Sequence, residues 1–327
     1  MKRKEGGRGL ISIRSCVDSE IRSLNEYIAN SDEELLMFAA DTLKLNANNI
    51  ETKDDFQKRL AREKVSELKA MKLHGQFEND TEEVKVKESW NWLRDGQLKR
   101  ETEALIMAAQ EQALNTNSIK KHIYKTGESD LCRLCSKNVE NVTHIVSGCE
   151  KLAQKEYKKR HDKVCLYIHW ALCKKHCFPT SPNWYEHVPE QVLENDDTKL
   201  LWDFAIQVDR VLNAGEEDEN ANRPDIVILN KKSRSCLLID VAIPNDHRNI
   251  KEKEDRKIKK YTDLKLEVSK IWNCSSKVIP VIVGALGSVT KNLEKYLKSL
   301  EVDCKISVIQ KSALLGTASI LRKFLSV

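Results

Sequence analysis

Apolar residues in the first 125 positions recur at helical spacing among many charged residues. We expect a helix after a capping box at residues 31–34, where serine and glutamate would satisfy the first backbone N–H groups. Further helices are expected over 52–73 and 100–124, with a break at His74 and Gly75. The lysines are interpreted as solvated helix faces, with a binding surface as the alternative. The pattern predicts a mainly α-helical region over residues 1–125.

The pattern changes at residue 126, where small polar residues are followed by clustered cysteines and histidines. A helical stretch then runs to about Lys175. Pro179 and Pro182 mark a linker, because proline interrupts both helices and strand ladders. We therefore expect a separate small segment over residues 126–182, ahead of a further domain at 190–327.

From Thr198 onward, short apolar runs alternate with helical periodicity, which is typical of a mixed α/β domain. The expected helices span residues 198–213, 251–272, 290–300 and 311–325. The expected strands span residues 225–230, 236–242, 278–283 and 304–309.

Composition narrows the class of protein without deciding its function. The 327 residues carry a net charge of +5, from 55 Lys+Arg against 50 Asp+Glu, which permits nucleic-acid binding without demanding it. No apolar run has the length of a signal peptide or a bilayer span, so we expect no membrane partner. The ten cysteines are spaced as a metal site plus scattered core thiols, not as a disulfide framework. A reducing compartment, cytosol or nucleus, is therefore expected.

Four residues form the pattern C-x2-C-x8-H-x4-C: Cys132, Cys135, His144 and Cys149. Three thiolates and one imidazole supply a closed tetrahedral zinc shell, and a shell with no open position is structural. Gly148 frees the backbone where the second ligand pair closes. In so small a segment, zinc would supply most of the folding free energy. The sequence thus predicts a CCHC zinc knuckle, with coincidental free cysteines as the alternative.

A second set of residues recurs every four positions along one side of the next helix: His161, Cys165, His169, Cys173 and Cys177. One interpretation is a second metal site. The other is a helix that packs thiols and histidines into a core, where free cysteine is often buried. We favour the core, because one straight helix cannot surround a zinc ion with more than two ligands.

An aspartate stands at the outer end of each of two neighbouring apolar runs, Asp225 before the first and Asp240 near the end of the second. The polar residues between the runs predict a hairpin. A turn centred on Lys232 and Ser233 places Asp225 opposite Asp240, with Cβ atoms about 5 Å apart. Two like charges so placed are unfavourable, and a hard cation such as Mg²⁺ removes that penalty. The alternative is two strand-end aspartates that face solvent.

The helix after the hairpin carries an apolar stripe formed by Ile250, Ile258, Tyr261, Leu264, Val268 and Ile271. Lys257 falls near the middle of this stripe, Lys260 at its edge and Lys253 beside it. A lysine that faces the two carboxylates is well placed to orient an attacking water or to hold a phosphate. The alternative for Lys257 is a side chain that extends past the apolar face to water.

These motifs, taken in order, resemble a known family. The CCHC knuckle, Arg-Pro-Asp at 223–225, a second aspartate after fourteen residues, and K-x-x-K-Y on the next helix are similar to the C-terminal region of non-LTR retrotransposon polyproteins that carry a restriction-like endonuclease. That domain is a PD-(D/E)XK nuclease. GGRGLISI, LHGQF and ETEALIMAAQEQAL resemble the thumb and linker that follow the polymerase, and VIPVIVGALG and ALLGTASILRKFL resemble the end of the nuclease. The resemblance covers nearly the whole chain.

The resemblance implies DNA nicking that supplies a 3′ end for target-primed reverse transcription. It places the metal-binding acids at Asp225 and Asp240, which would hold Mg²⁺ or Mn²⁺. It places the catalytic lysine at Lys257 or Lys260, and the helical wheel favours Lys257, with Lys260 and Tyr261 in support.

The chain also departs from the general nuclease pattern. A lysine normally stands two residues past the second acid, and Ala242 occupies that position here, so the lysine must come from the helix. An upstream acid completes the metal shell in many such nucleases, and Asp203 or Asp209 on the expected preceding helix is the candidate. The pairs at residues 54–55 and 196–197 lack the context of a polymerase acidic pair, so no reverse transcriptase activity is expected from this chain.

The sequence therefore predicts three parts: a helical thumb-like or linker-like region, a CCHC zinc knuckle, and a C-terminal α/β domain of the restriction-endonuclease type. The expected partners are target DNA, element RNA and a polymerase encoded elsewhere, in the nucleus. The rival interpretations are a nucleic-acid-binding remnant that has lost cleavage and a purely structural zinc protein that binds neither DNA nor RNA.

Overall fold

The computed structural model describes residues 3, 6–7, 12–46, 50–79, 84–209, 211–212, 221–246 and 249–326. The chain divides into two compact units, Met1–Glu78 and Asn79–Val327. Residues 84–125 of the predicted helical region therefore belong to the same unit as the cysteine cluster and the sheet. Within the described ranges, no helix combines the length and the apolar character that crossing a bilayer requires.

The first unit is helical. Its helices are α1 (Ile13–Ala29), α2 (Glu34–Thr42) and α3 (Lys53–Ala70), and α4 (Gln76–Asn79) follows at the division between the units. Ser12 Oγ accepts a hydrogen bond from the Ser15 N–H at 3.1 Å, and Thr52 Oγ1 accepts one from the Asp55 N–H at 3.1 Å. These side chains satisfy N–H groups that have no partner inside the helix, which explains where α1 and α3 begin.

The capping box predicted at residues 31–34 is wrong, although the helix predicted to follow it is present as α2. α2 begins at Glu34, and its N-cap residue Glu33 makes no side-chain hydrogen bond to the helix. Ser31 Oγ instead accepts from the Glu33 N–H at 3.3 Å. Ser31 stands three positions before the first helical residue, so its hydroxyl satisfies the turn ahead of the helix and not the helix itself.

The second unit contains helices on both sides of one sheet. The helical elements before the sheet are α5 (Val86–Ser89), α6 (Asn91–Asp95), α7 (Arg100–Gln110), α8 (Asn117–Ile119), η2 (Lys120–Tyr124), η3 (His144–Gly148), α9 (Glu150–Leu152), η4 (Ala153–Tyr157), α10 (Lys158–Lys175) and η5 (Trp184–Glu186). Those after the sheet begins are α11 (Asn249–Lys260), α12 (Thr262–Ile271), α13 (Leu293–Ser299) and α14 (Ile306–Leu325). The single helix expected over 100–124 is divided, because Gln112 adopts a left-handed backbone with φ of 53°.

Five strands of the described residues form one mixed sheet in the order β1-β2-β3-β4-β5. They are β1 (Val192–Glu194), β2 (Thr198–Trp202), β3 (Ile226–Asn230), β4 (Ser235–Ala242) and β5 (Ser275–Ile282). The first four strands pair antiparallel, and β5 pairs parallel to β4. A parallel partner requires a crossover, and α11 and α12 provide it.

Three elements differ from the sequence expectation. The helix expected over 198–213 is wrong: its first part is strand β2, because a segment of five residues is too short to show a periodicity of its own and here pairs with β1 and β3. The strand expected over 304–309 is also wrong, since α14 already begins at Ile306. The long helix expected over 251–272 is broken at Tyr261 into α11 and α12.

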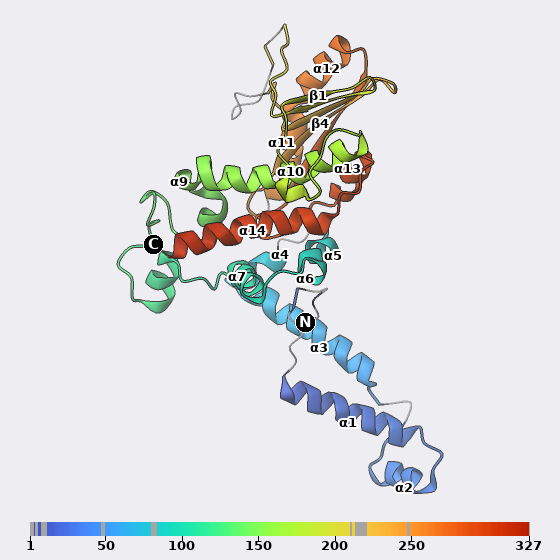
Figure 1. Ribbon diagram of the computed structural model, residues 1–327. Coiled ribbons are helices and arrows are strands. Elements are labelled where there is room, and N and C mark those ends of the chain that lie inside the picture. Colours follow the sequence, from blue (N-terminus) through green and yellow to red (C-terminus); the bar gives the residue numbers. More distant parts are fainter. Residues whose placement is uncertain are drawn as a thin grey trace. The chain divides into compact units, whose positions relative to one another are not determined.

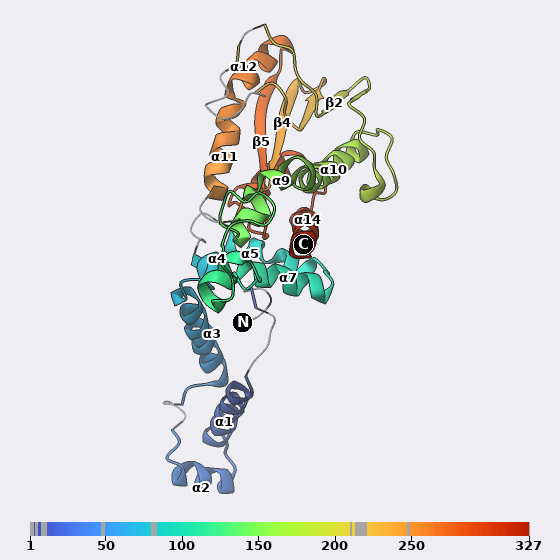
Figure 2. The same cartoon turned by 90° about the vertical axis from the view of Figure 1, so that its left-hand side faces the viewer.

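Different helices cover the two faces of the sheet, as Figure 2 shows for α10 on one side and α11 and α12 on the other. Ile226, Ile228 and Ile239 pack with apolar residues of α10, α13 and α14. Val227 and Leu238 point the other way and pack against the α11–α12 side. This alternation follows from the two-residue period of a strand. α10 and α14 also run side by side below the sheet (Figure 1).

Gln310 of α14 is fully buried and joins two segments far apart in the sequence. Its Nε2 donates to the Gly287 carbonyl at 2.6 Å and lies 3.1 Å from the Glu88 carbonyl and 3.2 Å from the Ser89 carbonyl. We expect Gln310→Leu to lower the free energy of unfolding by about 1–3 kcal/mol, because buried carbonyls would lose their donor. Urea titration measures the change. Leu315→Ala, at a position that is 41% exposed on the same helix, should cost less than about 0.5 kcal/mol, and equal losses in both variants would contradict this role of Gln310.

Candidate functional site

The hairpin of β3 and β4 sets its two aspartates opposite each other. The observed pairs run from Asn230 with Ser235 to Ile226 with Ile239, and the next step of the same register joins Asp225 and Asp240. This is the register predicted from the sequence. Both acids therefore lie at the end of the hairpin away from its turn.

Asp225 is held by groups from two other elements. Its Oδ2 accepts a hydrogen bond from the Val241 N–H of β4 at 2.6 Å. The same oxygen lies 3.1 Å from Nε2 of His161, on α10, and that nitrogen is also 3.1 Å from the Val241 carbonyl oxygen. The carboxylate is one-fifth exposed, so it remains within reach of solvent.

Asp240 is almost completely buried, with 2% of its surface exposed. The hydroxyl of Tyr261 donates to its Oδ1 at 2.6 Å, and Nζ of Lys257 forms an ion pair with Oδ2 at 2.7 Å. Lys257 lies in α11, and Tyr261 lies at the break between α11 and α12. Residues four positions apart lie on the same side of a helix, so the tyrosine and the lysine can both contact one carboxylate. Lys260 packs beside them, with its Nζ 5.1 Å from the centre of the Tyr261 ring.

The environments of the two acids differ in their effect on ionisation. Burial raises the pKa of Asp240 and the negative charge of Asp225 raises it further, while Lys257 and Tyr261 act in the opposite direction. Burial also opposes ionisation of Asp225, but the hydrogen bond and charge of His161 outweigh it and lower the pKa of Asp225. The result is one readily ionised acid beside one that holds a proton more strongly.

His161 is the group at this site that the sequence did not place there. Burial lowers the pKa of its imidazole, but Cys165, Asp162 and Asp225 outweigh that effect and raise it. Cys165 Sγ lies 3.7 Å from both ring nitrogens. The His161–Asp225 contact joins residues 64 positions apart, so only a known packing of α10 on the sheet could have predicted it.

Asp203 lies close to the acids through its backbone. Its N–H donates to the Asp225 carbonyl at 2.8 Å, while its carboxylate pairs with Nε of Arg223 at 2.8 Å. Asp203 follows β2 directly and has a φ of 45°, so it is not on a helix as expected, and neither is Asp209. Among the described contacts, its carboxylate is directed to Arg223 and not to the acid pair.

The four predicted knuckle residues converge on one point. The Sγ atoms of Cys132, Cys135 and Cys149 and a ring nitrogen of His144 all lie within 4.8 Å of one another, and all four residues are buried. Cys132 Sγ is 3.9 Å from Cys149 Sγ, and Cys135 Sγ is 3.4 Å from His144 Nε2. Zinc–ligand bonds of about 2.0–2.3 Å at tetrahedral angles give ligand separations of about 3.3–3.8 Å. The cluster therefore fits a metal ion such as zinc.

Neighbouring groups hold this cluster in place. Tyr157 accepts a hydrogen bond from the Cys149 N–H at 3.1 Å and donates to the Ile145 carbonyl at 2.8 Å. Burial opposes the thiolate of Cys135, but backbone N–H groups outweigh it, so the pKa of Cys135 is lowered. Burial lowers the pKa of His144, which favours the neutral imidazole that a metal needs. The backbone freedom expected of Gly148 is not used: it lies within η3 without a positive φ, and a Cβ there would make an ordinary contact of 3.4 Å with Nδ1 of His144.

The row of histidines and cysteines along α10 divides into two groups. His161 and Cys165 face Asp225, whereas His169 and Cys173 are fully buried beside His187, a residue outside the four-residue repeat. Burial lowers the pKa of His169 to about 3 and raises that of Cys173 to about 12. Cys177 lies past the end of α10 and is exposed, so it belongs to neither group.

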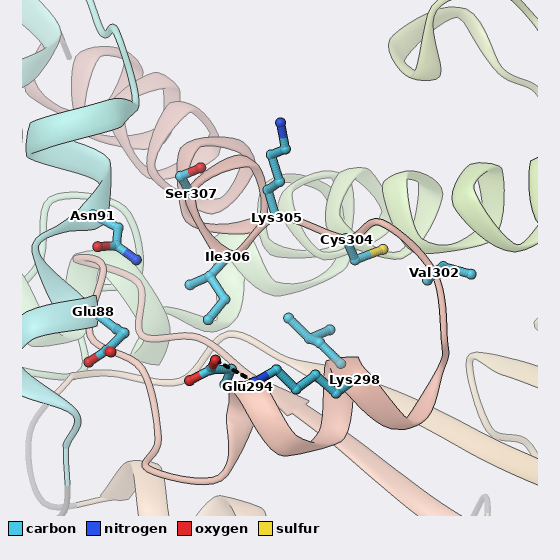
Figure 3. Close-up of a pocket in the computed structure, with 10 residues that line it drawn as sticks. Glu88, Asn91, Glu294, Lys298, Val302, Cys304, Lys305, Ile306 and Ser307 are labelled. Atoms are coloured by element: carbon cyan, nitrogen blue, oxygen red, sulfur yellow. Dashed lines mark ion pairs between the residues drawn. The ribbon is translucent and has the colours of Figure 1, made fainter.

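A surface hollow of about 410 Å³ lies between α5–α6, α13 and the start of α14, as Figure 3 shows. Glu294 and Lys298 form an ion pair at 2.9 Å along it, and Ile306 contributes apolar surface. The residues that line it include none of the site residues predicted from the sequence. Glu88, Glu294 and Lys298 already form ion pairs, so we do not regard the hollow as the chemical site.

A scan against protein-family models and a search of curated proteins both found no match to this chain. The function must therefore be argued from the geometry of the acid pair and the cysteine cluster, together with the resemblance carried by the sequence motifs.

Proposed function

We propose that this chain is a metal-dependent DNA endonuclease that nicks its target, with the acid pair at the end of the β3–β4 hairpin as its active centre. The observation that carries the proposal is the opposed pair Asp225 and Asp240, with Lys257 2.7 Å from the second acid. Two carboxylates can hold a divalent cation that assists phosphodiester hydrolysis, and a lysine beside them can stabilise charge on the phosphate. We also infer that the sheet and the helices on its two faces form a PD-(D/E)XK-type core.

Asp225 and Asp240 would hold Mg²⁺ or Mn²⁺, since carboxylate oxygens are the ligands that these hard cations select. When bound, the ion supplies activation of water and stabilisation of charge on the phosphate. Asp225 is one-fifth exposed, so its carboxylate is accessible from solvent. Asp203 would contribute to the site through its hydrogen bond to the Asp225 backbone.

The lysine and the tyrosine have separate tasks in this proposal. Lys257 is 15% exposed, so its ammonium group can both pair with Asp240 and meet a phosphate or an attacking water. Tyr261 is fully buried and positions Asp240 through the 2.6 Å hydrogen bond. Lys260, 8% exposed and packed over the Tyr261 ring, would support the position of the tyrosine and not contact the substrate.

The biological setting is proposed on the resemblance alone. Nicking would supply the 3′ end for target-primed reverse transcription by a non-LTR retrotransposon, with the polymerase provided by another chain. The partners would be target DNA and element RNA in the nucleus. The cysteine cluster would be a structural CCHC zinc knuckle, because its four ligands leave no open position.

One observation favours the alternative, a nucleic-acid-binding remnant without cleavage. Each acid already has a cationic partner, His161 for Asp225 and Lys257 for Asp240, so the pair is balanced without a metal ion. Incubation of the full chain with supercoiled plasmid and Mg²⁺ or Mn²⁺ separates the two functions. Metal-dependent relaxation supports the endonuclease, whereas DNA binding with no relaxation above background supports the remnant.

The lysine gives a specific prediction for this assay. We expect Lys257→Ala to lower the nicking rate by about 10²-fold or more, the size of a typical proton-transfer or charge-positioning contribution. Lys259→Ala, on the exposed side of the same helix, is the matched control and should keep the wild-type rate. Circular dichroism of both variants checks that α11 remains folded. Equal rates for the two variants would show that Lys257 is not the catalytic lysine.

A further inference from the structure

Three ligand-type side chains converge at a second place, on the opposite face of the sheet from α11 and α12. His169 and Cys173 stand one helical turn apart on α10, and His187 lies just after the short η5 turn. Nδ1 of His169 is 2.9 Å from Nε2 of His187 and 3.5 Å from Sγ of Cys173. His169 and Cys173 are fully buried and His187 is 7% exposed.

We propose that His169, Cys173 and His187 bind a second zinc ion. The ion would hold the segment that follows α10 against α10. The proposal goes beyond the nuclease function and does not depend on it. Thiolate and imidazole are the ligands that zinc selects in structural sites. Carboxylate-preferring ions such as Mg²⁺ have little affinity for such a set.

The separations suit one small ion. Zinc–nitrogen and zinc–sulfur bonds of about 2.0–2.3 Å at tetrahedral angles place two nitrogens about 3.3 Å apart and a nitrogen and a sulfur about 3.5 Å apart. The nitrogen–sulfur distance of 3.5 Å in the cluster already agrees with this value. The two nitrogens, at 2.9 Å, would have to separate by a few tenths of an ångström. The CCHC cluster shows a similar nitrogen–sulfur distance, 3.4 Å between Cys135 and His144.

The tertiary structure removes the objection that one helix supplies only two ligands. His187 comes from a different segment, 18 residues away from His169 in the sequence, and supplies the third ligand atom. Glu190 follows three residues later, is exposed, and its charge acts on both Cys173 and His187. A glutamate oxygen or a water molecule would complete a four-ligand shell.

Binding requires only a small rearrangement of protons. One of the two imidazoles carries the proton of the hydrogen bond between Nδ1 of His169 and Nε2 of His187. That ring changes tautomer, so its proton moves to its other nitrogen. Nδ1 of His169 and Nε2 of His187 then each offer a lone pair to the zinc ion. The Cys173 thiol releases its proton to solvent as the zinc–sulfur bond forms. No oxidant or reductant takes part.

The site also has a structural task. Residues 176–191 connect α10 to the sheet, and η5 is the regular element among them. Trp184 of η5 packs edge-on against Tyr167 of α10 with ring centres 5.5 Å apart, and the ring of His169 packs edge-on against Trp202 of β2 at 5.2 Å. A metal ion at His169, Cys173 and His187 would stabilise the packing of this connecting segment against α10.

The test is the zinc content of the full-length protein, measured by mass spectrometry after exhaustive dialysis against Mg²⁺ buffer. Wild type is expected to hold two zinc ions per chain. Cys173→Ser and His187→Gln should each hold one, and Cys132→Ser should retain the other. Cys177→Ser is the matched control, because this exposed thiol on the same part of the chain should leave two ions bound.

A zinc content of one ion per chain in the wild-type protein would by itself overturn the proposal. His169 and His187 would then be a hydrogen-bonded pair of imidazoles beside the Cys173 thiol. Two ions that remain in both Cys173→Ser and His187→Gln would overturn it as well. Replacement of zinc by cobalt gives an independent measurement. The two sites together hold four thiolates, three in the CCHC cluster and one from Cys173, so the sulfur-to-cobalt absorption of Cys173→Ser should be about one quarter lower than that of wild type. None of these results depends on DNA cleavage, so the nuclease proposal stands or falls separately.

Discussion

Asp225→Ala and Asp240→Ala are each expected to lower metal-dependent plasmid nicking by about 10³-fold or more. A bound divalent cation lowers the activation free energy of phosphodiester hydrolysis by several kcal/mol. Each loss of about 1.4 kcal/mol slows the reaction about tenfold. Both carboxylates lie at the same end of the hairpin, and removal of either leaves a single acid ligand there. The measurement is the rate at which supercoiled plasmid becomes open circle in saturating Mg²⁺.

Conservative variants separate loss of charge from loss of structure. Asp240→Asn keeps the size of the side chain and an acceptor for the Tyr261 hydroxyl, so it tests the charge alone. Both Asp240→Ala and Asp240→Asn remove the anion that pairs with the Lys257 ammonium, and breaking a buried ion pair costs about 3–5 kcal/mol. Asp240→Ala also removes the acceptor of the Tyr261 hydroxyl, so we expect Asp240→Asn to be the more stable of the two variants while nicking is lost in both, and urea unfolding compares their stabilities.

The control for the acids is Asp197→Ala. Asp197 is half exposed, pairs with Lys232 in the hairpin turn, and lies at the opposite end of the sheet from the acid pair. Its removal should leave the nicking rate within a factor of about two, because an exposed ion pair contributes little. If wild type, Asp225→Ala and Asp197→Ala all show the same background, the endonuclease proposal is lost. A gel-shift experiment with the same proteins then decides between a nucleic-acid-binding remnant and a structural zinc protein.

Loss of the knuckle zinc is expected to unfold residues 126–157 and to weaken the second unit around them. Structural zinc contributes about 10–16 kcal/mol of apparent binding free energy at neutral pH, which exceeds the total stability of most small segments. Without the ion, Cys132, Cys135 and Cys149 would remain as three buried thiols beside a buried imidazole, with no bond that joins them. We expect Cys135→Ser to abolish amide hydrogen-exchange protection in this segment, as followed by mass spectrometry.

The effect should extend to α14, because the knuckle packs on its end. The Arg133 guanidinium lies 5.0 Å from the centre of the Phe324 ring and pairs with the fully buried Glu140 at 2.7 Å. Phe324 itself is 1% exposed, and unfolding of the knuckle would uncover it. The Tm of Cys135→Ser should fall by several degrees, whereas Cys177→Ser should match wild type. An unchanged Tm and unchanged protection in Cys135→Ser would show that the cluster is not a metal-dependent structural unit.

The amino-acid sequence alone determined the register of the acid hairpin and the membership of the cysteine cluster. A short polar turn between two apolar runs leaves one pairing that buries both runs, and that pairing sets Asp225 against Asp240. The cysteine spacing is a local property, so the four ligands meet wherever the segment lies. The side of α11 on which Lys257 lies also follows from helical periodicity, even though the helix breaks sooner than expected.

Features that depend on contacts between segments far apart in the sequence were decided by the tertiary structure alone. Thr198–Trp202 became a strand because β1 and β3 pair with it, and five residues are too few to carry a periodicity that distinguishes strand from helix. His161 reached Asp225, and His187 reached His169 and Cys173, across 64 and 18 residues. A helical wheel shows which residues share a side of α10, but the element packed against that side determines their chemistry. The same repeat of histidine and cysteine therefore contributes to the acid pair at one end of the helix and forms a separate buried cluster at the other.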